Sequence, residues 1–270
     1  MSDREPLISI IMPNYNGGRW IGQAIASVVE QSYKNWELII IDDGSTDDSV
    51  QIAKKWQEKV LIAGEGYIRI LQYDHVGSAP FMRNRGLPWI YGGYIAFLDS
   101  DDWWIHLKLE KQLKYMQQND KFGLTYHDMG IEDSGLQFKI WSDRNKVCQG
   151  NCFKQLLYKN FIPTSSVMIK SDFICIQDPS LKISHDWNMW LDIAEKTEIG
   201  FLPEVRARLR MHEGSVTTDF SQRRKESREV IRRRKGKVSR YWYWKCLSRY
   251  YLAEIWESFG AGSRFGEIDG

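Results

Sequence analysis

The stretch that decides the fold is YIAFLDSDDW, Tyr94 to Trp103. Its apolar run, Ile95 to Leu98, has the length and composition of a strand buried inside a parallel sheet. Asp99, Asp101 and Asp102 follow at once, and unpaired carboxylates are not core residues because burying their charge costs too much. Ligands of open α/β sheets bind beyond the carboxyl ends of the strands. The stretch therefore predicts a strand that ends at a ligand site.

Two interpretations of these carboxylates remain open on the segment alone. Clustered carboxylate oxygens suit Mg²⁺ or Mn²⁺, and Mg²⁺ commonly bridges a few carboxylates to substrate phosphates. The alternative is an acidic surface turn that caps the next helix. The rest of the chain has to decide between them.

The composition limits the class of protein. The 270 residues, 43% of them hydrophobic, are enough for one large α/β domain or a domain with an appendage. The net charge of +2 gives no indication of nucleic-acid binding, and the four cysteines lack the spacing of a zinc site, so free thiols in a reducing cytoplasm are expected. The N-terminus lacks the features of a signal peptide, and no apolar run approaches the roughly 18 residues of a membrane helix. We expect a soluble cytoplasmic protein, bound at most to the inner face of the membrane.

Strand and helix patterns alternate along the first part of the chain, which predicts a parallel sheet with crossover helices. After about residue 120 the rhythm changes, and the segment 132–147 is polar and irregular. The expected strands are 7–12, 36–41, 67–73, 95–98, 122–130, 164–169, 200–205 and 207–211. The expected helices are 20–31, one that begins near Thr46 or Asp47, 79–91, 107–118, 151–158 and 186–196.

Polar segments also follow the first two expected strands. In PNYNGG, which begins at Pro13, Tyr15 could lie against a flat ring or be a surface residue of an ordinary turn. In DDGSTDD, Asp42 or Asp43 could accept a hydrogen bond from a nucleobase or a ribose. The alternative for this segment is an Asp-Gly turn followed by a helix cap.

A basic segment, HVGSAPFMRNRG, follows the third strand. Arg83 or Arg85 could reach a diphosphate from the flank of a helix, or could lie on a solvated helix surface.

The order and spacing of these segments resemble family 2 glycosyltransferases of the GT-A fold. The resemblance covers roughly residues 7 to 215. It implies an α/β fold, a GT-A Rossmann-like mixed, mainly parallel sheet flanked by helices, followed by a C-terminal helical tail. It divides the chain into a catalytic domain, 1–220, with a nucleotide-binding half to about residue 120 and an acceptor half from 121, and an extension, 221–270. The matching segments are SIIMPNYNGG, SVVEQSYKNWELIIIDDGSTDDS, MRNRG and GGYIAFLDSDDW.

The resemblance implies roles for individual donor-site residues. Pro13 and Tyr15 would line the base pocket, and Asp43 would hold the base with Asp42 beside it. Arg83 would lie near the phosphates of the nucleotide sugar.

The resemblance also implies a site for Mn²⁺ or Mg²⁺. Asp101 would be the direct metal ligand and Asp99 would help to hold the ribose or the metal waters, with Asp102 as a further contact. In VRARLRMHEGSVT, which resembles the R-x-H-x-G-S ending of the family, Arg210 and His212 would face the diphosphate or the metal.

The segment SHDWNMWLDIAE resembles the region of the catalytic base. Asp186 matches the base, which takes a proton from the acceptor hydroxyl; the alternative is a helix cap. His185 replaces the acidic neighbour that is usual in the family. The residues expected near the acceptor are Thr164, Ser165, His185 and Trp187.

The implied reaction transfers one sugar, with inversion, from a nucleoside-diphosphate sugar to an acceptor hydroxyl. A UDP-sugar is the favoured donor, and the acceptor would be a saccharide or a lipid-linked saccharide. The implied role is surface polysaccharide or glycoconjugate synthesis. The Q-x-x-R-W element and membrane helices of processive members are missing from the sequence. The alternatives are a sugar-1-phosphate nucleotidyltransferase and a non-catalytic sugar-nucleotide-binding protein.

The segment 223–259 is basic and then aromatic, with seven Arg and three Lys against two Glu between residues 223 and 240. Such a segment suits peripheral contact with an anionic membrane. The alternatives are helices that pack on the catalytic domain and a homodimer contact; a nucleic-acid module is not recognisable. The aromatic residues are Trp242, Trp244, Tyr250, Tyr251 and Trp256.

Overall fold

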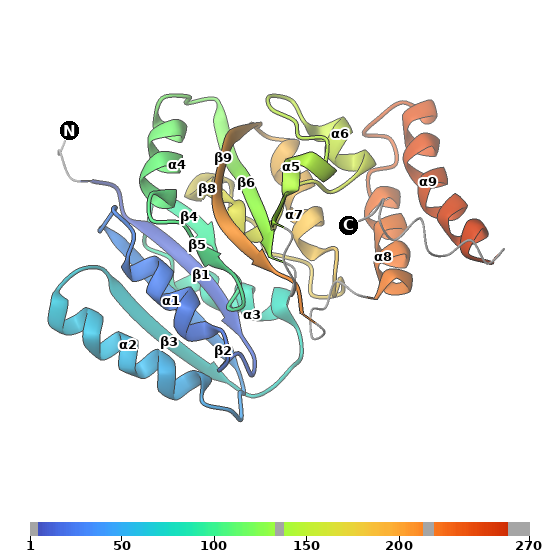
Figure 1. Ribbon diagram of the computed structural model, residues 1–270. Helices are drawn as coiled ribbons and strands as arrows, with labels where there is room; N and C mark the ends of the chain where they lie inside the picture. The colour runs from blue at the N-terminus through green and yellow to red at the C-terminus, as the bar shows by residue number, and fades with distance from the viewer. Residues whose placement is uncertain (1–4, 133–137, 213–218, 259–270) are drawn as a thin grey trace.

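The computed structural model describes residues 5–132, 138–212 and 219–258, which form one mixed sheet flanked by helices (Figure 1). The strand order is β3-β2-β1-β4-β8-β6-β9-β5, and β7 pairs with β6. The first four strands are parallel to one another, whereas β8 joins β4 and β6 in antiparallel ladders. The fold thus confirms the α/β class and the mixed sheet.

The first part of the chain, to about residue 120, follows the expected alternation closely. Its elements are β1 Ile8–Asn14, α1 Ile21–Val29, β2 Trp36–Asp43, α2 Ser49–Ala63, β3 Tyr67–Tyr73, α3 Ala79–Gly86, β4 Tyr94–Phe97, β5 Trp103–Trp104 and α4 Lys108–Gln117.

Apolar side chains of the central strands alternate between two hydrophobic clusters, one on each face of the sheet. Ile10 and Met12 of β1 join the cluster with α1, α2 and α4, whereas Ile11 joins the cluster with α3, α6, α7, α8 and α9. In β2, Ile40 belongs to the first of these clusters and Ile41 to the second. Because successive strand residues point to opposite faces, a continuous apolar run covers both faces of a buried sheet.

The second half of the chain completes the sheet and adds helices to one face. Its elements are β6 Phe122–Glu132, β7 Phe138–Ile140, α5 Trp141–Arg144, α6 Phe153–Tyr158, β8 Met168–Lys170, α7 His185–Ala194 and β9 Glu198–Arg210.

Four expectations about secondary structure are wrong in detail. The helix expected over 79–91 ends at Gly86, and the 3₁₀ turn Leu87–Trp89 follows it. Pro88 in that turn lacks the N–H that an α-helix would need there. In the segment 132–147, expected to be irregular, the described part contains β7 and α5.

The strand expected over 164–169 is mostly a 3₁₀ turn, Thr164–Ser166, and the strand begins only at Met168. Backbone hydrogen bonds from Ser166 to Pro163 and from Val167 to Thr164 close this turn. The two strands expected over 200–211 are a single strand, β9, whose pairing with β6 shifts register around Asp128.

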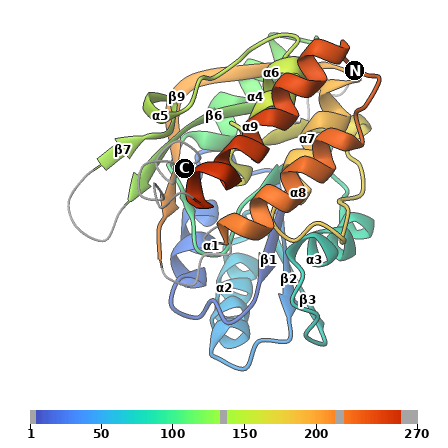
Figure 2. The ribbon, with the colours of Figure 1, turned by 90° about the vertical axis from the view of Figure 1, so that its right-hand side faces the viewer.

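The basic and aromatic tail is helical, as expected, and its helices α8 Phe220–Arg232 and α9 Arg240–Ser258 lie side by side (Figure 2). Val230 and Ile231 of α8 and Cys246 and Leu247 of α9 belong to the same hydrophobic cluster as α6 and α7. The tail therefore packs on the part of the chain that carries α6 and α7, as one of the alternatives supposed. The side chain of Trp256 lies outside the described residues. The division of the chain at residues 120 and 220 stays a prediction.

No helix in the described ranges is both long enough and apolar enough to span a bilayer.

Candidate active site

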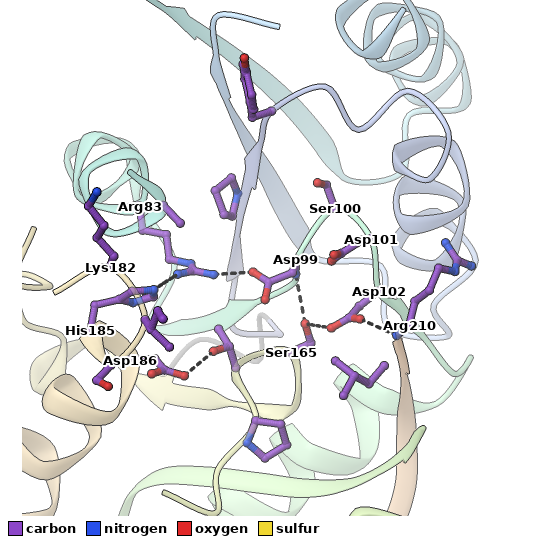
Figure 3. A pocket seen from close by; sticks show the side chains of 18 of the residues that line it. Arg83, Asp99, Ser100, Asp101, Asp102, Ser165, Lys182, His185, Asp186 and Arg210 are labelled. Carbon is purple, nitrogen blue, oxygen red and sulfur yellow. Dashed lines mark hydrogen bonds and ion pairs between the residues drawn. The ribbon is translucent and has the colours of Figure 1, made fainter. Parts of the chain in front are cut away.

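A cavity of about 1060 Å³ lies where β1, β2 and β4 end, and residues after position 120 form its opposite wall. Figure 3 shows how the side chains of the two halves approach each other across this pocket. Among the residues singled out in the sequence, the pocket is lined by Pro13, Tyr15, Asp43, Arg83, Asp99, Asp101, Asp102, Thr164, Ser165, His185, Asp186, Trp187, Arg210 and His212.

Asp42 is not among the lining residues. Its buried carboxylate accepts hydrogen bonds from Asn14 Nδ2 at 2.8 Å and from the backbone N–H of Ser45 at 2.9 Å. Asp42 thus joins the end of β1 to the turn after β2. Any effect of Asp42 on a bound nucleotide sugar would be indirect.

Asp43 lines the pocket and also fixes the loop after β3. Its two carboxylate oxygens accept the backbone N–H groups of Val76 and Gly77 at 2.7 and 2.8 Å. The ring of His75 in this loop stacks on Tyr15, with 4.0 Å between ring centroids, and Tyr15 is 48% exposed. Two flat rings and a carboxylate therefore lie together at this end of the pocket. The sequence did not assign His75 a role, because its meeting with Tyr15 depends on the path of the loop.

Arg83 lines the pocket although it is only 4% exposed. Its Nη2 pairs with Asp99 Oδ1, and its Nη1 lies 3.5 Å from both ring nitrogens of His185 (Figure 3). Burial and the charge of Arg83 hold the pKa of His185 well below its ordinary value, so this histidine is neutral near neutral pH.

Asp99 also begins a hydrogen-bond chain to the far wall. Its backbone N–H donates to Ser165 Oγ at 3.1 Å, and this hydroxyl donates to Asp102 Oδ2 at 2.6 Å. Asp102 Oδ1 accepts the backbone N–H of Arg210 at 3.1 Å. Ser165 and Asp102 are both buried, so their polar atoms connect parts of the protein to one another.

Burial and the charges of Asp101 and Asp99 raise the pKa of Asp102 well above the ordinary range of an aspartate. Asp102 therefore fits a structural role better than a ligand contact, and the hydroxyl of Ser165 is already engaged in the same network.

Asp101 and His212 lie together at the pocket, with 3.0 Å between Asp101 Oδ2 and His212 Nε2. Burial and the nearby charge of Asp99 raise the pKa of Asp101. A carboxylate and an imidazole are suitable ligands for Mn²⁺, and the carboxylate suits Mg²⁺. Among the described residues, no three His, Cys, Asp or Glu side chains form a complete metal cluster. The pair therefore fits a metal that takes its other ligands from phosphates and water. Glu213 to Thr217, the rest of the R-x-H-x-G-S segment, lie outside the described residues.

The guanidinium of Arg210 is held between aromatic rings at the pocket. It lies 4.0 Å from the ring centroid of Trp20 and 4.7 Å from that of Trp103, and its Nη2 donates to Gln23 Oε1 at 2.6 Å. Such stacking fixes a cation without neutralising it. Arg210 can therefore present positive charge to an anionic ligand.

Asp186 lies in the first turn of α7 and borders the pocket. One oxygen accepts the hydroxyl of Thr164 at 3.0 Å, and the other accepts the N–H of Trp187 at 2.5 Å. Burial raises the pKa of this carboxyl, and these two hydrogen bonds with the charge of Arg83 partly oppose the increase. A partly exposed carboxylate with a raised pKa is suited to accept a proton.

Trp187 contributes to the pocket wall mainly as a packing residue. Its side chain is buried, its indole N–H donates to the backbone oxygen of Leu156 at 2.7 Å, and its ring centroid lies 6.2 Å from that of Tyr250 in α9.

A buried carboxylate from the tail holds the segment before Asp186. Glu226 of α8, 4% exposed, accepts the backbone N–H groups of Lys182, Ile183 and Ser184, each at 2.8 Å. These three residues lead directly into α7. The sequence offered no signal for this contact, because it joins residues more than forty positions apart.

Comparisons with known proteins identify the family of this chain. The family model described as glycosyl transferase family 2 matches residues 9–175, and the chain belongs to this family. The family assignment favours a glycosyltransferase over the two alternatives weighed from the sequence, a nucleotidyltransferase and a non-catalytic binding protein.

Two curated relatives illustrate the family. The chain is 30% identical over 222 residues to a putative teichuronic acid biosynthesis glycosyltransferase, TuaG, of Bacillus subtilis, covering 81% of this chain and 84% of the relative. It is 30% identical over 214 residues to WfaP of Escherichia coli, a UDP-Glc:alpha-D-GlcNAc-diphosphoundecaprenol beta-1,3-glucosyltransferase, covering 79% of this chain and 80% of the relative. Other relatives are longer, and the chain spans 34% of an uncharacterized glycosyltransferase of Rickettsia felis.

Solved structures support the fold. The chain matches S. aureus TarS in complex with UDP-GlcNAc with a TM-score of 0.72 and 17% identity, covering 93% of this chain and 72% of that one. It matches the mannosyltransferase PcManGT of Pyrobaculum calidifontis, in complex with GDP-Man and Mn²⁺, with a TM-score of 0.69 and 14% identity, covering 93% of this chain and 71% of that one. The fold is the GT-A fold of these glycosyltransferases.

The contact of Glu226 with the segment before α7 leads to a first prediction. Replacing Glu226 by Ala leaves three backbone N–H groups without their acceptor, so the start of α7 and Asp186 shift. We expect kcat to fall by about 10- to 100-fold, because small displacements of catalytic groups have effects of that order. The Kd for UDP with Mn²⁺ should change little, because Glu226 does not line the pocket.

The control is Glu229→Ala on the same helix, which removes an exposed pair with Arg233. Glu226→Gln, which keeps one oxygen acceptor, should recover part of the activity. Equal losses in the two alanine variants, or a loss explained by unfolding at the assay temperature, would contradict the positioning role.

Proposed function

We propose that this glycosyltransferase transfers one sugar, with inversion, from a nucleoside-diphosphate sugar to the hydroxyl of a saccharide or lipid-linked saccharide, in surface polysaccharide or glycoconjugate synthesis. The observation that carries the proposal is the shared pocket, in which the Asp186 carboxylate faces the same space as Arg83, Asp99 and the Asp101–His212 pair. A base, cations for phosphates and suitable metal ligands are thus available to the two substrates at once.

We favour a UDP-sugar as donor and a lipid-linked saccharide as acceptor. UDP-GlcNAc is the ligand in the TarS complex, and WfaP is named for transfer from UDP-Glc to a diphosphoundecaprenol-linked sugar. The aromatic ring of Tyr15 beside Asp43 offers a surface and an acceptor atom for a nucleobase.

In the proposed reaction the residues of the chain divide into donor-binding and proton-transferring groups. Arg83 and Arg210 offset the charge that develops on the leaving nucleoside diphosphate. Mn²⁺ or Mg²⁺, held by Asp101 and His212 with support from Asp99, would supply further positive charge at the same phosphates.

Asp186 accepts the proton of the acceptor hydroxyl as that oxygen attacks the anomeric carbon. The bond from the anomeric carbon to the diphosphate oxygen breaks in the same step, so one displacement inverts the configuration. Thr164 holds the carboxylate through its hydrogen bond, and burial together with the charge of Arg83 lowers the pKa of His185, which keeps this histidine neutral beside Asp186.

The metal assignment is tested by Asp101→Asn, which removes the charge of one ligand. We expect kcat/KM to fall by at least about 100-fold, as when one electrostatic stabiliser of a transition state is removed. The measurement is nucleoside diphosphate release as a function of Mn²⁺ concentration, with a panel of UDP- and GDP-sugars as donors. Asp48→Asn, at an exposed position outside the pocket, is the control. Activity and Mn²⁺ dependence like those of the wild type would rule the assignment out.

The base assignment is tested by pH dependence. Since Asp186 acts when deprotonated and its pKa is raised above 3.8, kcat/KM should decline as the pH falls through that raised pKa. Thr164→Val removes a hydrogen bond that favours the carboxylate, so the acidic limb should move to higher pH. Asp186→Asn should lower kcat by roughly 10²- to 10⁴-fold.

An acidic limb that stays in place in Thr164→Val, or moves to lower pH, would contradict this assignment. The product distinguishes the reaction class, because a transferase releases nucleoside diphosphate and a nucleotidyltransferase releases pyrophosphate.

We further propose that the protein is cytoplasmic and binds the inner face of the membrane through the outer face of α9. Tyr241, Trp244 and Leu252 are exposed there, and Lys245 lies beside them. Aromatic rings with cations favour an anionic bilayer surface. A homodimer through this face is the alternative, and the oligomeric state in solution distinguishes it.

The prediction is that Trp244→Ala weakens binding to phosphatidylserine-containing vesicles several-fold without lowering stability, because this side chain is 58% exposed. Leu247→Ala, on the buried face of the same helix, should instead destabilise the fold by about 2–5 kcal/mol. Co-sedimentation and urea unfolding measure the two effects. Equal binding of wild type and Trp244→Ala to these vesicles would count against the membrane contact.

A further inference from the structure

The turn that carries Thr164 and Ser165 is held by two side chains that do not line the pocket. The carbonyl groups at the end of a helical turn have no donor within the turn and need one from elsewhere. The indole N–H of Trp104 donates to the backbone oxygen of Ser165 at 2.8 Å, and Gln112 Nε2 donates to that of Ser166 at 2.9 Å. Trp104 and Gln112 are both buried and lie outside the pocket lining. Two consecutive carbonyl groups of the turn are thus fixed from outside the site.

The side chain of Gln112 is itself fixed in place. It is fully buried in α4, and its Nε2 also lies 3.0 Å from the backbone oxygen and 3.1 Å from the hydroxyl oxygen of Thr125 in β6. One helical turn earlier, Lys108 Nζ lies 3.9 Å from the ring centroid of Trp104 and 3.5 Å from the backbone oxygen of Val167. The turn is therefore joined to a buried polar cluster between α4 and β6.

The same turn connects the two groups of residues that the proposed reaction needs. Ser165 Oγ accepts the backbone N–H of Asp99 at 3.1 Å and donates to Asp102 at 2.6 Å (Figure 3). The hydroxyl of Thr164 donates to Asp186 Oδ2 at 3.0 Å. Because Thr164 and Ser165 are adjacent, a displacement of the turn changes both sets of contacts at once.

We infer that Trp104 and Gln112 are positioning residues for the sugar transfer, and that they act through the turn Thr164–Ser166 on the carboxylate of Asp186. The inference rests on the proposed function, in which Asp186 is the base. The held carbonyl groups keep the Thr164 hydroxyl within hydrogen-bond distance of Asp186. This hydrogen bond lowers the pKa of the carboxyl, against the increase caused by burial. Loss of the contacts behind the turn should therefore raise the pKa of Asp186 and also slow the transfer.

The experiment is a double-mutant cycle between Gln112→Met and Thr164→Val on the full chain. Met has nearly the same length as Gln but donates no hydrogen bond. The measurement is nucleoside diphosphate release as a function of pH, from the UDP- or GDP-sugar that the wild type turns over fastest with water as the acceptor. The acidic limb of kcat/KM reports the pKa of the base in the free enzyme.

We expect the acidic limb in Gln112→Met to move to higher pH by about 0.5–1 pH unit, the equivalent of one hydrogen bond. The direction is that of Thr164→Val, since Asp186 acts when deprotonated. We also expect kcat to fall by about 10- to 100-fold. The double variant should show the shift of Thr164→Val alone, because the hydroxyl through which Gln112 acts is already gone.

Leu113→Ala is the control for loss of stability. Leu113 is the next residue of α4, is 4% exposed and belongs to the hydrophobic cluster with α1 and α2. This variant should unfold at a lower urea concentration without moving the acidic limb. Trp104→Phe, which keeps a ring and loses the indole N–H, is the second variant and should move the limb in the same direction as Gln112→Met. If Gln112→Met does not fold, the cycle is measured with Trp104→Phe.

The outcomes separate this inference from the proposed function. A limb that moves in Thr164→Val but stays in place in Gln112→Met or Trp104→Phe would overturn the positioning role alone. Additive shifts in the double variant, or an equal shift in Leu113→Ala, would overturn it too. A limb that does not move in Thr164→Val, or a wild type that turns over no donor, would instead contradict the proposed function.

Discussion

The guanidinium of Arg83 and the carboxylate of Asp99 form an ion pair that joins α3 to the loop after β4, and the rest of the site is arranged around it. Arg83 is nearly buried, so loss of Asp99 would leave an uncompensated charge in a place of low polarity. The same guanidinium lies against His185, and the backbone of Asp99 continues the network to Ser165. This pair, in which the arginine is buried, thus connects the two walls of the pocket.

The start of α7, which borders the pocket, is held in place by side chains of the tail. Glu226 holds the three residues before His185, and Arg234, which follows α8, donates to Asn188 and Asp192 of α7. A carboxylate that accepts several backbone N–H groups orders a segment that has no regular structure of its own. The charged residues of the tail therefore fall into two groups. Some of them maintain the fold, and others remain exposed on the surface.

The site residues that could be predicted are those at the ends of parallel strands. Such ends meet at one edge of a sheet, and this does not depend on the conformation of the loops. Asp43, Asp99 and Asp101 were found in this way. Ser165 lines the pocket and Asp42 does not, and hydrogen bonds hold both side chains to other parts of the protein. Adjacent residues of a strand point in opposite directions, so the choice between Asp42 and Asp43 at the end of β2 depended on the packing around them.

The sequence by itself determined the alternation of strands and helices, the two apolar faces of the central strands and the family, because these depend on local periodicity and on motifs of short span. Only the tertiary structure decided which carboxylates face the pocket, that His75 stacks on Tyr15, and that Glu226 holds the segment before Asp186. The physical reason is that these contacts join side chains from distant segments, and their geometry follows from how the helices pack on the sheet.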